Sequence, residues 1–178
     1  MNNIVLIGMS GVGKTKVGQY ISKKLEMTLF DTDNIIETKY GITISDIFSN
    51  FGEQYFRSLE NKIIEDVSKY NNSVISTGGG VVLNSINIYN LKKNGIIFWL
   101  KADLNTIYNN LKKDSSSANT RPLLGNGLNL KERIEQLYGE REKLYASNSD
   151  YVVQVDGRTI EDVGDEIIFI FKSLNSCS

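Results

Sequence analysis

The most informative absence in this chain is histidine, which does not occur at all. Histidine is the commonest general base, it activates serine and cysteine nucleophiles, and it is a frequent zinc ligand. None of these kinds of site can therefore be present. Any chemistry must rely on carboxylates, cations, backbone dipoles or a metal bound by hydroxyl oxygen.

Cysteine is almost absent as well, because Cys177 is the only one. A lone cysteine excludes an intramolecular disulfide and a cysteine metal cluster. The chain should therefore fold without a covalent or metal staple. A length of 178 residues is sufficient for that and predicts one domain over residues 1–178.

The chain also lacks an excess charge and a long apolar run. Twenty basic and 21 acidic residues leave a net charge of -1, whereas a general nucleic-acid binder needs a basic surface. The apolar run near the N-terminus covers only residues 4–7, and no run approaches the length that spans a bilayer. We expect no nucleic-acid partner, no membrane association and a cytoplasmic location.

Short apolar runs alternate with segments of helical period, which predicts an α/β fold with helices on both faces of a parallel sheet. The run at residues 4–7 does not alternate with polar residues, as expected for a strand buried on both faces. The predicted strands are 3–7, 28–31, 73–76, 95–100 and 151–155. The predicted helices are 14–25, 33–40, 53–70, 83–93, 103–112, 130–145 and 160–173.

The first predicted turn carries a phosphate-binding motif. Residues 8–15 read G-M-S-G-V-G-K-T, which fits G-x-x-x-x-G-K-[ST] directly after a strand and at the start of a helix. Such a loop and helix N-terminus bind phosphate anions, with Lys14 on the β and γ phosphates and the Thr15 hydroxyl on Mg²⁺. The predicted ATP-binding residues here are Gly11, Val12, Gly13, Lys14, Thr15 and Lys16.

Two aspartates follow the second predicted strand. Asp31 and Asp33 should lie at the same edge of the sheet as the phosphate-binding loop. One can hold a metal-bound water while the other accepts a hydrogen bond from a substrate hydroxyl. Strand 73–76 ends in Ser76 where P-loop proteins usually have Asp, so Asp31 is the expected substitute and Ser76 a second contact to metal-bound water.

Glycines and arginines supply the remaining candidates. Gly78, Gly79 and Gly80 allow close approach of the backbone to a ligand, although a tight turn alone would also explain them. Arg57 and Arg141 together suggest two guanidiniums that hold a carboxylate, and each by itself also fits a surface helix residue.

The segment 114–129 is polar, bears glycine and contains Pro122, the only proline. A connection this long is either a solvated surface loop or a functional segment. Because Arg121 lies within it, we expect a lid that closes over an anion.

Taken in order, these residues resemble the shikimate kinase family, in the nucleoside monophosphate kinase-like group of P-loop proteins. The likeness covers nearly the whole chain, through the phosphate-binding loop, F-D-T-D, G-E-x-x-F-R-x-x-E, G-G-G, R-P-L-L and R-x-x-x-Y. It implies a three-layer α/β/α sandwich whose five-stranded parallel sheet has the order 2-3-1-4-5. It also implies an acceptor-binding region at 32–60, a mobile lid at 112–129 and a monomer.

The implied reaction is transfer of the γ-phosphoryl group of ATP to the 3-hydroxyl of shikimate, on the pathway to chorismate. Asp33 would hold the ring hydroxyls and orient or deprotonate the attacking one, while Lys14 and Arg121 would neutralise charge on the phosphoryl group. Arg158 would stack on adenine. The implied acceptor contacts are Asp33, Arg57, Gly78, Gly79, Gly80 and Arg141, with Glu60 orienting Arg57 and with Phe48 and Phe56 as an apolar wall.

Two alternatives stay open at this point. One is a related kinase that acts on gluconate or a nucleoside monophosphate, since two arginines would suit the gluconate carboxylate as well. The other is a protein of the same fold that binds shikimate without catalysis, although Lys14, Asp33 and Arg57 are all intact.

Overall fold

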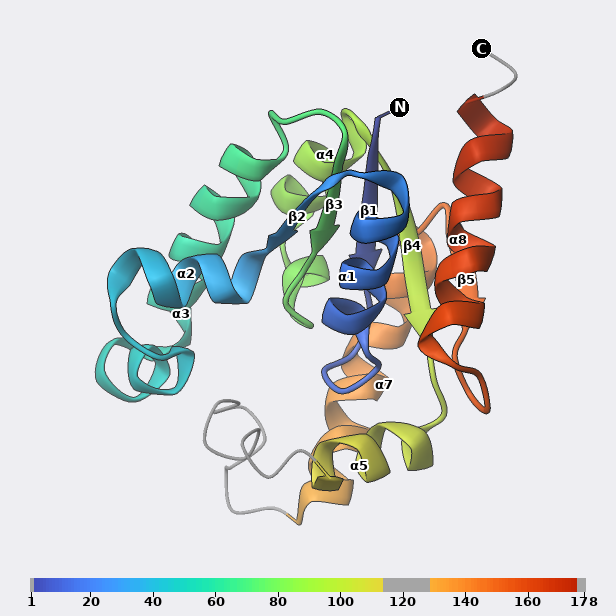
Figure 1. The fold of residues 1–178 in the computed structure, drawn as a ribbon. Helices are drawn as coiled ribbons and strands as arrows, with labels where there is room; N and C mark the ends of the chain where they lie inside the picture. Colours follow the sequence, from blue (N-terminus) through green and yellow to red (C-terminus); the bar gives the residue numbers. More distant parts are fainter. Residues whose placement is uncertain (1, 114–128, 176–178) are drawn as a thin grey trace.

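The computed structural model describes residues 2–113 and 129–175. Its centre is a five-stranded sheet with the order β2-β3-β1-β4-β5, and every neighbouring pair is parallel (Figure 1). The predicted strand order is confirmed. The strands are β1 (Asn3–Ile7), β2 (Thr28–Asp31), β3 (Ser73–Ser76), β4 (Gly95–Lys101) and β5 (Tyr151–Gln154).

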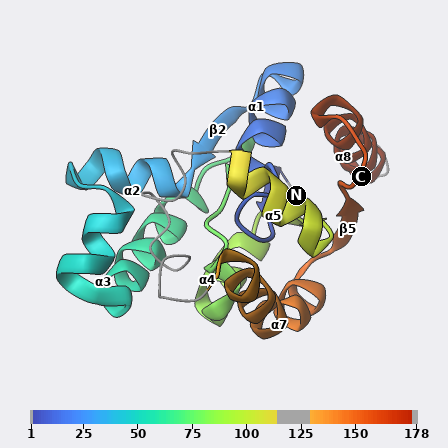
Figure 2. The same cartoon turned by 90° about the horizontal axis from the view of Figure 1, so that it is seen from below.

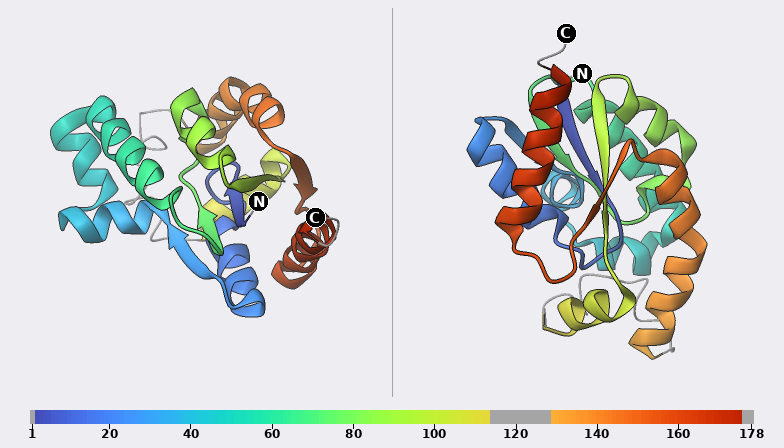
Figure 3. Two further views of the ribbon diagram at one scale, coloured as in Figure 1. Left: turned by 90° about the horizontal axis from the view of Figure 1, so that it is seen from above. Right: turned by 90° about the vertical axis from the view of Figure 1, so that its right-hand side faces the viewer.

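Helices cover both faces of this sheet. Helices α1 and α8 pack against each other on one face, and α3, α4 and α7 lie toward the other, so the predicted three layers are present (Figure 3). The helices are α1 (Lys14–Leu25), α2 (Thr32–Tyr40), α3 (Ile44–Val67), α4 (Ser85–Lys92), α5 (Leu104–Lys113), α7 (Leu130–Asn148) and α8 (Ile160–Asn175), with a short 3₁₀ helix η1 (Val81–Leu83).

The hydrophobic core follows the central strands. All five residues of β1 are buried, and β4 is buried from Gly95 through Leu100. Because β1 lies between β3 and β4 and has helices above and below, neither of its faces meets water, which explains the unbroken apolar run 4–7. This rigid centre fixes the positions of the loops at its carboxyl end.

The largest difference from the predicted helices is in α3. We expected a helix from residue 53, but α3 begins at Ile44, with the Thr43 side chain accepting a hydrogen bond from the Asp46 N–H as its N-cap. Gly52 interrupts the helix with φ 80° and ψ 169°, a backbone conformation that residues with a Cβ rarely adopt. The helix is therefore two helices joined at a glycine kink, and only the second had been predicted.

The other differences are small. Helix α2 begins one residue earlier than expected because Asp31 is its N-cap, and predicted helix 83–93 is divided between η1 and α4. The predicted lid, apart from Lys112, Lys113 and Asn129, lies outside the described residues. Within residues 2–113 and 129–175, every helix is too short or too polar to traverse a bilayer.

The carboxyl ends of the strands gather the loops of interest at one end of the sheet. Figure 2 looks at this end: α5 lies beside the loop that follows β1, with α2 and α3 on one side and α7 on the other. Crevices at the carboxyl ends of parallel strands are where open α/β folds bind their ligands.

Candidate active site

The phosphate-binding loop runs from β1 into α1, as its sequence predicted. Gly11 and Gly13 have φ values of 88° and 94°, which only glycine adopts without strain. A Cβ on Gly11 would also lie 2.8 Å from Cγ of Leu111 on α5. The loop conformation is thus set both by backbone freedom and by the close packing of α5.

Lys14 is the first residue of α1 and is buried. Its Nζ donates hydrogen bonds to the carbonyl oxygens of Gly8 at 2.8 Å and Met9 at 2.9 Å. The ammonium group is therefore held above its own loop, where a bound phosphate would meet it.

Thr15 and Asp31 meet at the start of α1 and the end of β2. The Thr15 hydroxyl donates to Oδ2 of Asp31 at 2.7 Å, while Oδ1 of Asp31 accepts from the N–H of Asn34 at 3.2 Å. Asp31 thus caps α2 and also supplies a carboxylate beside the phosphate-binding loop. A hydroxyl and a carboxylate this close are suitable oxygen ligands for a hard cation and its water.

Two cavities open at this end of the sheet. The first, of 950 Å³, is lined by every residue predicted to bind ATP in the described chain: Gly11, Val12, Gly13, Lys14, Thr15, Lys16 and Arg158. The second, of 630 Å³, is lined by the nine predicted acceptor contacts: Asp33, Phe48, Phe56, Arg57, Glu60, Gly78, Gly79, Gly80 and Arg141. Each of the two predicted sets of residues therefore lines one cavity.

The two cavities share a wall. Thr15, Asp31, Asp33 and Gly79 line both of them, together with Ser10 and Gln19. A ligand in one cavity and a ligand in the other would therefore meet at Asp33 and the Thr15–Asp31 pair.

Asp33 occupies a strongly perturbed environment at this junction. Burial, followed by the nearby carboxylates of Glu60 and Asp31, raises its pKa to about 7, against the opposing effect of Lys14 and Arg57. Its Oδ1 is buried and has no hydrogen-bond partner within the described chain. A buried oxygen without a partner is costly, and a ligand hydroxyl in the cavity would relieve that cost.

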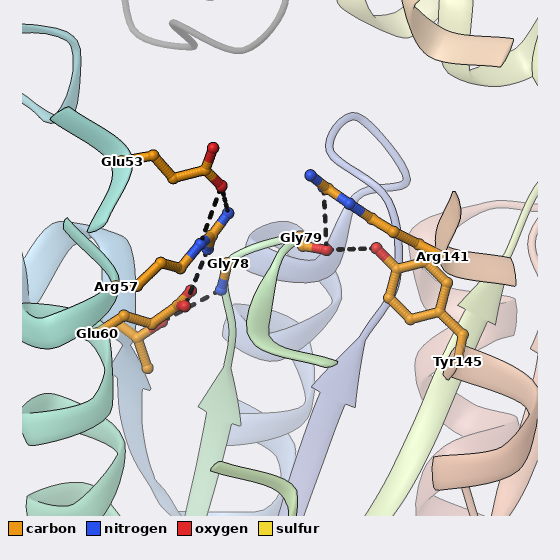
Figure 4. Close-up of polar contacts among 8 residues, drawn as sticks. Glu53, Arg57, Glu60, Gly78, Gly79, Arg141 and Tyr145 are labelled. Atoms are coloured by element: carbon orange, nitrogen blue, oxygen red, sulfur yellow. Dashed lines mark hydrogen bonds and ion pairs between the residues drawn. The ribbon is translucent and has the colours of Figure 1, made fainter. Parts of the chain in front are cut away.

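Arg57 is held from two sides by its own helix (Figure 4). Its Nη1 donates to Oε2 of the buried Glu60 at 2.9 Å, and its Nε and Nη2 both donate to Oε1 of Glu53 at 3.2 and 3.0 Å. Burial raises the pKa of Glu60, and the Arg57 charge opposes this rise. The predicted role of Glu60 in orienting Arg57 agrees with this contact.

Arg141 lies across the cavity from Arg57, on α7 (Figure 4). Its Nη1 donates to the carbonyl oxygen of Gly79 at 3.4 Å, and its buried Nε has no hydrogen-bond partner within the described chain. The same carbonyl accepts a hydrogen bond from the hydroxyl of Tyr145, one turn further along α7. Two guanidiniums from α3 and α7 thus face one cavity with the glycine turn between them.

The three glycines are explained by their neighbours. A Cβ on Gly78 would lie 2.7 Å from Oδ1 of Asp33 and 3.0 Å from Oε1 of Glu60, and a Cβ on Gly80 would overlap the guanidinium of Arg57. At Gly78 and Gly80, the space that a side chain would fill is occupied by charged groups of the acceptor cavity, whereas a Cβ on Gly79 would lie 3.2 Å from the backbone N of Ser10 in the phosphate-binding loop.

Ser76, Arg121 and Arg158 were also predicted as site residues. Ser76 is buried beside Asp31 in the β2–β3 register but lines neither cavity. Arg121 lies outside the described residues. Arg158 lines the first cavity while its guanidinium contacts Glu166, the Gln154 carbonyl and the Asp162 carbonyl. The predicted stacking of Arg158 on adenine stays a prediction.

Sequence reasoning missed several residues of the site. Gln19 lines both cavities, and the side-chain amide of Asn110 on α5 donates to the Gly11 carbonyl at 2.9 Å. The sequence marks Tyr145 only as the last residue of the R-x-x-x-Y motif. Gln19 could have been found from its position one turn beyond Thr15 on a helix, whereas the contact of Asn110 needs the tertiary structure.

Comparison with known proteins gives one consistent answer. A sequence model described as shikimate kinase matches residues 10–171. Shikimate kinases of Caldicellulosiruptor bescii and Thermodesulfovibrio yellowstonii are 45% and 43% identical to this chain over 176 residues, with at least 98% of each protein covered. The structure of a shikimate kinase from Acinetobacter baumannii in complex with shikimate has a TM-score of 0.89 at 30% identity, over 97% of this chain and 94% of that one. By its motifs, its fold and its full-length relatives, this chain belongs to the shikimate kinase family.

Proposed function

We propose that this protein transfers the γ-phosphoryl group of ATP to the 3-hydroxyl of shikimate, giving ADP and shikimate 3-phosphate. The proposal rests chiefly on one observation: the cavity at the phosphate-binding loop and the cavity between two guanidiniums share Thr15, Asp31, Asp33 and Gly79. Phosphoryl transfer requires that donor and acceptor be placed in line with their charges neutralised. The shared wall is where that placement would occur.

The nucleotide would bind on the loop side. Backbone N–H groups of residues 8–15 and the N-terminus of α1 would receive the phosphates. Lys14 Nζ, which contacts the carbonyls of Gly8 and Met9 in this structure, would turn to the β and γ phosphates. Arg121 would neutralise further charge on the transferring group, a role that comes from the family resemblance.

The acceptor would bind on the other side of the shared wall. Arg57 and Arg141 would hold the shikimate carboxylate, and Phe48 and Phe56, whose ring centroids are 4.9 Å apart, would form an apolar wall. Asp33 would accept the hydrogen bond of the attacking hydroxyl at its unpartnered Oδ1. A carboxylate held in this position orients the hydroxyl and can receive its proton as the new O–P bond forms.

Mg²⁺ fits the residues between the two cavities. The Thr15 hydroxyl and the Asp31 carboxylate, with their oxygens 2.7 Å apart, would hold the ion, Asp31 through a water molecule. The ion would supply positive charge to the phosphate oxygens. In the described part of the chain, no three histidine, cysteine, aspartate or glutamate side chains cluster as a metal cage.

An acceptor panel tests the proposal and its alternatives together. Purified protein is incubated with ATP and Mg²⁺, and ADP release is measured with shikimate, gluconate and nucleoside monophosphates in turn. We expect ADP release only when shikimate is the acceptor. Turnover with another acceptor would indicate the related kinase, and shikimate binding without turnover would indicate the non-catalytic protein. The monomeric state is a further prediction, which light scattering on a sizing column can check.

A further inference from the structure

The hydroxyl of Tyr145 ends at the centre of the glycine turn. Tyr145 is fully buried, and its ring stacks on Trp99 with centroids 5.7 Å apart. The hydroxyl donates to the Gly79 carbonyl (Figure 4). It also lies 3.7 Å from Sδ of Met9. Burial raises the pKa of Tyr145 to about 12, so the hydroxyl keeps its proton at neutral pH. Tyr145 therefore connects α7, the glycine turn and the residue that precedes Ser10 in the phosphate-binding loop.

This hydrogen bond sets the direction of one peptide group. The Gly79–Gly80 peptide is trans, so its N–H points opposite to its C=O. Because the Gly79 carbonyl is directed at α7, the Gly80 N–H is directed away from α7, toward the side on which Arg57 lies (Figure 4). Gly80 lines the acceptor cavity, and its N–H makes no hydrogen bond within residues 2–113 and 129–175.

The Gly79 carbonyl also contacts Arg141. Nη1 of Arg141 is 3.4 Å from the Gly79 oxygen, which is at the long end for a hydrogen bond. The Tyr145 hydroxyl donates to the same oxygen, and a carbonyl oxygen can accept both hydrogen bonds. The buried Nε of Arg141 has no hydrogen-bond partner within the described residues.

We propose that Tyr145 is a positioning residue for the acceptor: its hydroxyl fixes the Gly79–Gly80 peptide so that the Gly80 N–H donates to an oxygen of the bound acceptor. This inference rests on the proposed function, since it concerns the acceptor cavity. Tyr145 itself does not line that cavity, so it acts only through Gly79 and Gly80.

The test compares two tyrosines of α7. Tyr145→Phe removes the hydroxyl at the turn, while the control Tyr138→Phe removes a hydroxyl that donates to Glu142 at 3.0 Å, away from the cavity. We expect Tyr145→Phe to raise the KM for shikimate roughly 3- to 10-fold, as the loss of one or two hydrogen bonds implies, with the KM for ATP unchanged. Tyr138→Phe should change neither KM.

The outcomes separate the inference from the proposed function. No shikimate-dependent ADP release by the wild-type protein would refute the function, before any variant is compared. An active wild type with an unchanged shikimate KM in Tyr145→Phe would overturn the inference. So would an equal rise in both KM values, which would indicate a general structural role.

A second measurement needs no variant, in case Tyr145→Phe does not fold. In ¹⁵N-glycine-labelled wild-type protein, saturating shikimate should shift the Gly80 amide resonance downfield because its N–H gains an acceptor. The amide of Gly139, a glycine of α7 with no atom within 4 Å of its Cβ position, serves as the internal control. A Gly80 resonance that shikimate leaves in place would overturn the inference as well.

Discussion

Arg57 and Glu60 form an ion pair of 2.9 Å in which the carboxylate is almost completely buried and the guanidinium lies at the cavity wall. The two residues are one turn apart on α3, so the helix itself brings their side chains together. The Arg57 guanidinium is therefore oriented before any acceptor arrives. Orientation in advance saves the ordering entropy that a flexible arginine would lose on binding.

Glu60→Gln should weaken acceptor binding. It removes the buried negative charge that opposes Arg57, leaving only the half-exposed Glu53 to hold the guanidinium. We expect a rise in the shikimate KM of roughly 3- to 10-fold with little change for ATP. Glu65→Gln, on the same helix, breaks the exposed pair with Lys69 just beyond the end of α3; it is the control and should have no kinetic effect. Equal kinetics for Glu60→Gln and wild type would refute this orienting role.

Arg57→Ala should have a larger effect of the same kind. It removes charge-assisted hydrogen bonds to the carboxylate that exist before reaction, so the shikimate KM should rise roughly 10- to 100-fold. Lys62→Ala removes an exposed cation of α3 and controls for net charge. If Arg57→Ala changed only the affinity for ATP, the assignment of Arg57 to the acceptor would be wrong.

Asp33→Asn should lower kcat while it leaves ATP binding nearly intact. The amide still fills the site but cannot take a proton, and loss of general base catalysis typically costs roughly 100- to 10,000-fold in rate. Turnover under saturating substrates and a separate titration with an ATP analogue distinguish the two effects. Asp66→Asn, at the surface of α3, is the control. Wild-type turnover in Asp33→Asn would remove Asp33 from the mechanism.

Gly80→Ala tests the packing of the glycine turn against Arg57. The new Cβ would overlap the guanidinium, so Arg57 or the turn must move, and we expect the shikimate KM to rise roughly 10-fold or more. Gly139→Ala, inside α7 where the Cβ position is open, should leave both KM values unchanged and stabilise the protein by roughly 0.5–1 kcal/mol. Thermal unfolding and kinetics on both variants check this contrast. A Gly80→Ala protein with normal kinetics would contradict it.

Thr15→Val tests the proposed magnesium site. Without the hydroxyl that now donates to Asp31 at 2.7 Å, one oxygen ligand is lost, and the Mg²⁺ concentration for half-maximal rate should rise ~10-fold. Thr15→Ser should retain the wild-type dependence, and Thr28→Val, at the exposed start of β2, controls for the substitution itself. An unchanged Mg²⁺ dependence in Thr15→Val would show that Thr15 is not a ligand.

Much of the fold was accessible from sequence because its signals are local. Strands β1, β2 and β3 were predicted with the bounds that the structure has, since each is a short apolar run ended by glycine or a polar residue. The first half of α3 was missed although Ile44, Ile47, Phe48 and Phe51 recur at helical spacing after the cap at Thr43. The predicted helix starts at Glu53, directly after the glycine at the kink.

The raised pKa of Asp33 depends on its tertiary environment. A chain without histidine has no side chain whose ordinary pKa lies between about 5 and 8, so only a strongly perturbed group can titrate there. Asp33 is such a group, with a pKa of about 7 caused mainly by burial. Burial is a property of all the elements packed around a group, so it cannot be read from neighbouring residues in the chain.

The sequence by itself determined the phosphate-binding loop, the strand order through its family resemblance, and the residue types available for catalysis in a chain without histidine. These follow from motifs whose chemistry depends on fixed spacing along the backbone. Only the tertiary structure decided that Arg57 and Arg141 face one cavity, that Gly78 and Gly80 make room for charged side chains, and that Tyr145 holds the turn between them. Such contacts join α3, the β3 turn and α7, and their geometry is fixed by packing rather than by sequence separation.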